Sequence, residues 1–448
     1  MSHPVQPSEN VAPAATAAPA GGAYAWYVVG VLVIAYTVSF IDRTILTLMV
    51  GPIRKSLEIS DLQLSLLHGL AFAIFYTTLG IPMARYADSH NRTRLISAGI
   101  FFWSFMTALC GLARNFFQMF MARVGVGIGE AALSPAAYSI IADYFPPHKL
   151  TRALSVYSAS IYIGTGVAMI AGGAIISMVP AMTLPGIGYM EPWRVVFLAV
   201  GLPGIFVVML MATVREPPRT GLTARFSAGK AVPIRQVLAF IGERRAAYGL
   251  IIVGFSVKGM LWNGVTAWLP TFFARTYGWE PGKIGLYYGL AVIVFGTSGI
   301  LTGGWISGRL RARGMTDANI WAGIAAALLM LPFGAVAPLM PTGEIALAVF
   351  CVFIFFASYP IGSAAAAIQE ITPNQLRAQM SAIYLLGSNL IGIGLGPSVV
   401  AAFTDLVFQD DNMLRYSITA MCLFAAPVGA LLLWLGLKPY RAAMANAR

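Results

Sequence analysis

The chain has 448 residues, of which 10% are charged and 58% are hydrophobic, and its mean hydropathy is +0.76. Soluble domains carry about 25% charged residues and roughly 45–50% apolar ones. The composition therefore excludes an ordinary water-soluble protein, a disordered chain and a nucleic-acid-binding protein. It predicts an all-α integral membrane protein, because the bilayer core favours long apolar helices. The net charge of +12 is expected to lie in cytoplasmic loops.

Residues 1–23 are rich in Ala, Pro, Ser and Thr, which predicts a disordered tail rather than a signal peptide. Twelve apolar runs long enough to span a bilayer follow, in two sets of six. The first set is expected near residues 24–50, 63–84, 94–113, 115–141, 151–178 and 194–214. The second is expected near residues 246–272, 282–306, 317–338, 345–370, 376–403 and 412–436. Residues 215–245 then form a linker between two six-helix bundles, 24–214 and 246–436, and residues 437–448 a C-terminal tail.

Charge predicts the orientation. An even number of spans places both termini on one side of the membrane. If that side is the cytoplasm, nineteen Lys and Arg residues fall in the inside segments and seven in the outside loops. The bias predicts cytoplasmic termini in the inner (plasma) membrane of the cell.

The two halves look like repeats. The run Pro147…Arg152-Ala153…Ser155…Tyr157 before span five recurs before span eleven as Pro373…Arg377-Ala378…Ser381…Tyr384. Duplicated six-helix halves are typical of transporters, in which the substrate site lies between the halves near the midplane.

These landmarks resemble the major facilitator superfamily. Its signature between spans two and three, Gly-x-x-x-Asp-Arg-x-Gly-Arg, is matched here by Asp88 and Arg92, although Ala84 and Ser89 depart from it. Three further segments resemble the spinster-like branch of this superfamily: Phe40-Ile41-Asp42-Arg43, Arg123-x-Gly125-x-Gly127-x-Gly129-Glu130 and Gly392-x-Gly394-x-Gly396-Pro397. The resemblance implies a major facilitator fold and transport of lysolipids or sphingoid lipids, coupled to protons. The antiporter signature of span five is degraded, with Ala168-Met169 where Gly-Pro is expected, so symport and antiport both stay open.

Five ionisable residues lie deep inside predicted spans: Asp42, Arg43, Arg123, Glu130 and Lys258. A charge at the centre of a membrane helix costs about 2.5–3.5 kcal/mol, so it needs a partner or a water-filled cavity. Asp42 and Glu130 are the candidate proton carriers, because carboxyl groups can change charge with their surroundings. Arg43 and Arg123 stay charged and are candidate switching cations or substrate anchors. Lys258 either binds an anionic ligand or reaches Glu130, and both alternatives are open.

Weaker candidates for the same cavity are polar or amphipathic residues on cavity-facing spans: Trp262, Asn263, Tyr384, Ser388 and Asn389. For any one of them, helix packing is the simpler explanation. By resemblance, Asp88, Arg92, Asp143 and Arg152 form a cytoplasmic gate that latches the halves in the outward-open state.

The leading hypothesis is a non-enzymatic secondary active transporter, working by rocker-switch alternating access as a monomer. Its partners are an amphipathic lipid-like substrate, protons and the lipid bilayer. The alternative is a drug or organic-anion carrier of the same superfamily. The absence of a Walker phosphate loop argues against ATP as the energy source. Scattered Cys and His residues predict neither a metal site nor a cofactor.

Overall fold

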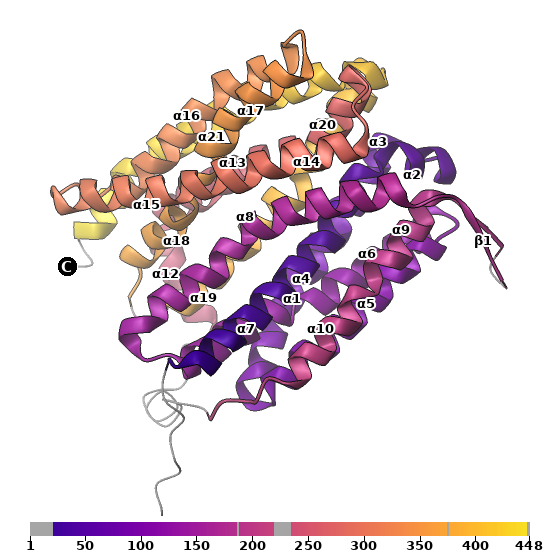
Figure 1. Ribbon diagram of the computed structural model, residues 1–448. Helices are drawn as coiled ribbons and strands as arrows, with labels where there is room; N and C mark the ends of the chain where they lie inside the picture. Colours follow the sequence, from indigo (N-terminus) through magenta and orange to yellow (C-terminus); the bar gives the residue numbers. More distant parts are fainter. Residues whose placement is uncertain (1–20, 186–187, 219–233, 374–375, 446–448) are drawn as a thin grey trace, which may run out of the picture.

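The computed structural model describes residues 21–185, 188–218, 234–373 and 376–445. Twelve helical stretches in these ranges are long and apolar enough to cross a membrane. They confirm the all-α architecture of two six-helix bundles, and the two bundles lie side by side in Figure 1. We call the end of the bundles where α1 begins and α21 ends the terminal end, and the opposite end the far end.

The N-terminal bundle is assembled from α1 (Ala23–Leu48), α2 (Val50–Leu57), α3 (Asp61–His68), α4 (Leu70–Ser89), α5 (Arg92–Leu112), α6 (Phe116–Glu130), α7 (Leu133–Tyr144), α8 (Pro147–Met178), α9 (Pro192–Gly201) and α10 (Pro203–Ala212). A small antiparallel hairpin at the far end joins α8 to α9 through β1 (Met182–Leu184) and β2 (Gly188–Met190). Helix α12 (Ile234–Glu243) belongs to the linker.

The C-terminal bundle consists of α13 (Arg245–Tyr277), α14 (Pro281–Ala291), η1 (Val292–Gly296), α15 (Thr297–Ala312), α16 (Ala318–Val336), η2 (Ala337–Leu339), α17 (Gly343–Ser358), α18 (Ile361–Glu370), α19 (Arg377–Ser388), η3 (Asn389–Leu395), α20 (Gly396–Ala402), η4 (Phe403–Phe408), η5 (Asp411–Met413) and α21 (Leu414–Ala445). Helix α21 continues well beyond the predicted span, where Tyr440 donates a hydrogen bond to Glu370 (2.5 Å) and Arg441 to Asp317 (2.5 and 2.8 Å). These contacts make most of the predicted C-terminal tail part of the bundle.

Several spans are interrupted where they meet a neighbour. Span two breaks at Gly69, between α3 and α4. A Cβ at Gly69 would lie 2.6 Å from the carbonyl oxygen of Ile393 in η3, so only glycine permits this contact between the bundles. A second close contact joins α8 to α14, where a Cβ on Gly173 would lie 2.6 Å from the carbonyl oxygen of Pro281. Two seams of small residues therefore hold the bundles together.

The apolar core divides along the same lines. In the far half of the molecule a single cluster of buried side chains runs through both bundles, including Ile45 and Trp193 from one and Trp268 from the other. Toward the terminal end each bundle has its own cluster, with Trp103 in the first and Tyr248 in the second. Among the described residues, the buried cluster that both bundles share therefore lies toward the far end.

Candidate membrane-embedded charge site

Glu130 and Arg43 form an ion pair inside the N-terminal bundle. Helix α1 carries Arg43, and Glu130 is the last residue of α6. Arg43 Nε donates to Glu130 Oε2 at 2.5 Å, and Ser39 Oγ donates to the same oxygen at 2.7 Å. The Glu130 side chain is fully buried, whereas that of Arg43 is 17% exposed. The helix dipole disfavours a negative charge at the C-terminal end of a helix. The hydrogen bonds from Arg43 and Ser39 therefore stabilise the Glu130 carboxylate.

Aromatic rings surround the Arg43 guanidinium. Its central carbon lies 5.2 Å from the ring centre of Phe40, 4.5 Å from that of Phe72 and 4.9 Å from that of Tyr76. Cation–π contacts of this kind stabilise an arginine in a place that water reaches poorly. In this conformation Arg43 therefore binds Glu130 and contacts aromatic rings of α1 and α4.

Asp42 and Arg123 lie at the same height, as the sequence predicts, but they meet through the backbone. The Arg123 guanidinium donates to the main-chain carbonyl oxygens of Asp42 (3.1 Å) and Leu67 (3.3 Å). The Asp42 side chain is fully buried, and neither of its oxygens accepts a hydrogen bond from any residue that the structure describes. An ionised carboxylate would be costly in such a place, so the geometry suits a protonated Asp42.

Lys258 lies in the opposite bundle, on α13. It is buried, and its Nζ donates to the main-chain carbonyl oxygen of Ala357. No ion pair between Lys258 and an acid is found within the described ranges, and Glu130 is occupied by Arg43. Of the two alternatives for Lys258, contact with Glu130 is thus not formed in this conformation.

The predicted polar candidates of the C-terminal bundle are half-buried. The ring centre of Trp262 lies 6.3 Å from that of Tyr162 in the N-terminal bundle and 6.4 Å from that of Phe353. Asn263 donates to Gly259 on its own helix at 2.9 Å, an interaction that needs no ligand. Asn389 begins η3, where the helix changes from α to π winding, and Tyr384 lies five residues earlier on α19.

The predicted gate residues at the terminal end lie within one bundle. Arg92 donates to Asp143 and, through Nε, to Glu216 (both ion pairs, 2.5 and 2.6 Å). The Arg152 guanidinium lies 5.7 Å from the ring centre of Trp26, and the side chain of Asp88 lies outside the described residues. Among the described residues, no ion pair joins the two bundles at this end.

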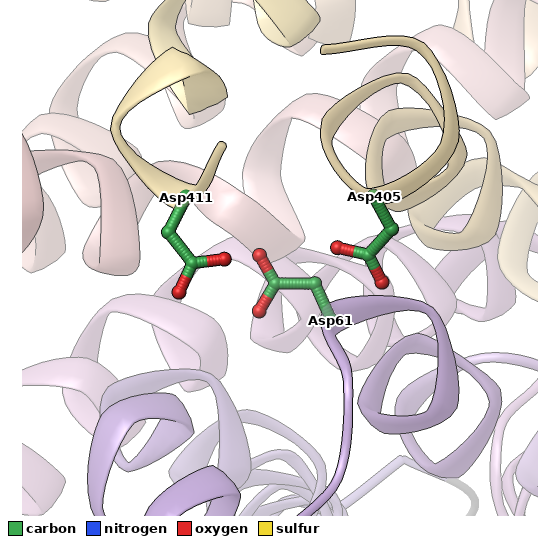
Figure 2. A group of neighbouring side chains, drawn as sticks. All are labelled: Asp61, Asp405 and Asp411. Atoms are coloured by element: carbon green, nitrogen blue, oxygen red, sulfur yellow. The ribbon is translucent and has the colours of Figure 1, made fainter. Parts of the chain in front are cut away.

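A charged cluster at the far end does join the bundles, and sequence reasoning missed it. We call it the far-end latch; its residues are Arg54 and Asp61 from the N-terminal bundle, and Arg275, Asp405 and Asp411 from the C-terminal bundle. Arg275 makes a two-pronged contact with Asp61 (2.6 and 2.8 Å), and Arg54 binds Asp411 at 2.5 Å. Asp405 accepts the backbone N–H of Leu62 at 2.7 Å. Figure 2 shows the Asp61 side chain between Asp405 and Asp411 of the other bundle, with its carboxylate directed toward Asp411.

The latch is held by arginines. The three carboxylates lie within 4.8 Å of one another, a spacing that could hold a metal ion. Arg54 and Arg275 already bind two of these acids, and Arg54 also contacts Asp61 at 3.0 Å. The hydrogen bond from Arg54 to Asp411 and the neighbouring carboxylates outweigh the effect of burial and raise the pKa of Arg54. The only local signal in the sequence is Ser60, which caps the helix that Asp61 begins. The partners are far apart along the chain, so no motif spacing predicts their contact.

Comparison with known proteins gives the same family as the fold. The family model described as "Major Facilitator Superfamily" matches residues 32–397. An "MFS-type efflux pump" of Mycolicibacterium smegmatis is 29% identical, over 93% of this chain and 94% of its own length. "Protein spinster homolog 1" of Bos taurus is 26% identical, over 86% of this chain and 74% of its own.

A solved structure supports this assignment. The crystal structure of a bacterial homologue of the human lysosomal transporter spinster, in an inward-facing and unoccupied conformation, superposes with a TM-score of 0.78. The two sequences are 27% identical, and the match covers 95% of this chain and 98% of the other. Together with the twelve spans and the paired bundles, these matches show that the chain belongs to the major facilitator superfamily and is a spinster-like, multi-pass secondary transporter.

Proposed function

We propose that this transporter is proton-coupled and carries an amphipathic, lipid-like substrate, a lysolipid or a sphingoid lipid, by alternating access. The observation that carries the proposal is the buried Asp42 carboxyl, which accepts no hydrogen bond from the described residues and lies beside Arg123. A carboxyl group in this environment changes its charge when a neighbouring cation moves. Asp42 and Glu130 are the proton carriers in this proposal.

The substrate part of the proposal rests on the C-terminal bundle. Lys258 is a buried cation without a carboxylate partner in the described ranges, and such a group favours an anionic ligand. Trp262 is half-buried four residues after Lys258 on α13, and its ring contacts those of Tyr162 in the other bundle and of Phe353. In this proposal Lys258 binds the anionic head group of an amphipathic molecule and Trp262 contacts its apolar tail.

The transport cycle follows from the unequal ends. The far-end latch and the two glycine seams hold the bundles together on one side, and the shared apolar core lies there too. With the termini in the cytoplasm of a plasma-membrane protein, this conformation is inward-facing. Opening of the latch and approach of Asp88, Arg92, Asp143 and Arg152 to the other bundle at the terminal end give the outward-open state.

Flux into proteoliposomes tests the proposal. Purified protein is reconstituted, and uptake of a fluorescent lysophospholipid and of a sphingoid-base phosphate is measured with and without an imposed pH gradient. We expect flux to follow the gradient and to collapse when a protonophore dissipates it. Equal flux with and without the gradient would exclude proton coupling.

The second candidate is a carrier of drugs or organic anions, which the similarity to an efflux pump favours. The same vesicles distinguish it. Gradient-driven movement of a cationic dye or a small organic anion, with no movement of either lipid, would replace the lipid proposal by this one.

A further inference from the structure

The carboxyl group of Asp42 faces two polar side chains of α5 that also lack partners. The indole N–H of Trp103 and the hydroxyl of Thr107 lie beside it, yet neither reaches hydrogen-bond geometry. Both residues are fully buried. Within the part of the chain that the structure describes, Trp103 Nε1, Thr107 Oγ1 and both Asp42 oxygens all lack a hydrogen-bond partner. Four unsatisfied polar atoms in one place are unusual, since buried polar groups are nearly always paired.

Local packing brings the two donors to this place. Trp103 and Thr107 are four residues apart, so they lie on one face of α5. Helix α5 approaches α6 closely at Gly129, where a Cβ would lie 2.8 Å from both the backbone nitrogen and the Cβ of Trp103. The glycine beside Glu130 therefore fixes how near Trp103 comes to the charge site.

The chemistry of the donors is matched to an ionised acid. An indole N–H can only donate, and a hydroxyl can donate or accept. A protonated carboxyl group keeps only its carbonyl oxygen as a good acceptor, whereas a carboxylate offers two charged oxygens that can accept from both donors and bind them more strongly. When the O–H bond of Asp42 breaks, the proton passes to a water molecule and the electron pair stays on the carboxylate, which then draws both donors.

We propose that Trp103 and Thr107 are positioning residues that bind the Asp42 carboxylate after it has released its proton, and so set the pH at which Asp42 exchanges protons. The inference deepens the proposed function, because it rests on Asp42 as a proton carrier. Arg123 and Glu130 of α6 and Cys110 of α5 also face Asp42, and His68 at the end of α3 faces Arg123. These groups are unchanged in the variants below, so a difference between variants reports on the missing donor.

The test measures the proton on Asp42 directly. The infrared C=O band of protonated carboxyl groups is titrated with pH in the full-length protein, and the part that Asp42→Asn removes is assigned to Asp42. Thr107→Val removes the hydroxyl at almost constant shape, and Trp103→Phe removes the indole N–H. We expect each change to move the half-titration point of the Asp42 band upward by about one to two pH units, since a hydrogen bond to the charged form is lost.

Thr107→Ser is the matched control, because it keeps the hydroxyl and should leave the titration at its original pH. An unshifted Asp42 band in folded Thr107→Val protein would overturn the inference, even if Trp103→Phe fails to fold. A shifted band in a protein whose transport ignores the pH gradient would leave the inference standing and overturn proton coupling. If no infrared band depends on Asp42 at any pH, both this inference and the role of Asp42 as a proton carrier are wrong.

Discussion

Asp42 and Glu130 are both buried acids, but they are held in opposite ways. Glu130 accepts hydrogen bonds from Arg43 and Ser39, whereas the Asp42 carboxyl accepts none from the described residues. Neutralising the two should therefore have different effects on folding. Asp42→Asn should abolish gradient-driven transport with little loss of stability, because no ion pair is lost. Glu130→Gln should also impair coupling, and should lower stability by about 3–5 kcal/mol because it leaves Arg43 unpaired.

Proteoliposome flux and thermal unfolding in detergent check this prediction together. Asp317→Asn, which removes a pair with Arg441 at the terminal end, is the control for a general loss of acidic charge. Transport by Asp42→Asn that still follows the pH gradient would remove Asp42 from the mechanism. Unfolding of both variants would mean that the site serves packing alone.

Lys258 makes a separate prediction about the substrate. Lys258→Met should weaken binding of a phosphorylated lipid by about 10–150-fold, since one charge-assisted hydrogen bond is lost. A dephosphorylated lipid of the same chain length should bind as before. Binding of the lipid pair to wild type, Lys258→Met and Lys258→Arg measures the effect, and Lys258→Arg should retain most of the preference. Equal losses for the two lipids would assign Lys258 to gating instead.

Sequence reasoning finds the residues of the charge site more readily than their partners. Buried charges stand out in an apolar chain, and depth along a helix places Asp42 near Arg123. Which acid binds Arg43 depends on Ser39 and on rings contributed by α4, and these contacts arise from packing between spans. The contact of Lys258 with a carbonyl oxygen of α17 has no signature in the sequence either.

At the scale of the elements, the far-end latch should set the balance between the two conformations. Asp61→Asn weakens the acceptor shared by Arg54 and Arg275. We expect a shift of about 2 kcal/mol toward far-end opening, roughly thirtyfold in the equilibrium constant. Spin labels at Lys55 and Asn412, exposed residues of the two bundles, report the distance across the far end.

Lys283→Met is the matched control for the latch, because Lys283 binds Glu344 at 2.7 Å at the same end but within one bundle. This variant should leave the distance distribution unchanged. If Asp61→Asn also leaves it unchanged, the latch contributes nothing to closure.

The seam between α8 and α14 gives a steric prediction. Gly173→Ala places a methyl group 2.6 Å from the carbonyl oxygen of Pro281, and this backbone contact cannot yield as a flexible side chain would. The variant should therefore favour far-end opening while the N-terminal bundle stays folded. Gly304→Ala in α15 adds the same methyl group in open space and should have no effect. The spin-label distance across the far end is measured in both variants. Identical distance distributions for Gly173→Ala and Gly304→Ala would mean that the seam does not help to close the far end.

The extent of the spans follows closely from apolar length, because a bilayer sets one thickness for all of them. The breaks within the spans cannot be predicted from apolar length. The kink at Gly69 and the wide turns of η3 occur where α4 meets the second bundle, and hydropathy does not record contacts between bundles. Helix α21 likewise runs past its predicted end, since Arg441 and Tyr440 find partners inside the bundle rather than in water.

For the whole molecule, the asymmetry of Lys and Arg predicts that the terminal end faces the cytoplasm. Single-cysteine variants in a background without Cys110, Cys351 and Cys422 test this orientation. In intact cells an impermeant maleimide should label a cysteine at Lys55, at the far end, and should reach one at Arg311, at the terminal end, only after lysis. The reverse pattern would invert the conformation assigned to this structure.

The far-end latch also has two electrically different layers. Asp61 is fully buried, while the side chain of Asp411 is 50% exposed. Ions in the medium screen exposed charges over about 8–10 Å but act weakly on buried pairs. Rising salt at the far end would loosen the contact between Arg54 and Asp411 first and leave Arg275 bound to Asp61. The exposed contact should therefore weaken with ionic strength, whereas the buried contact between Arg275 and Asp61 should hardly change.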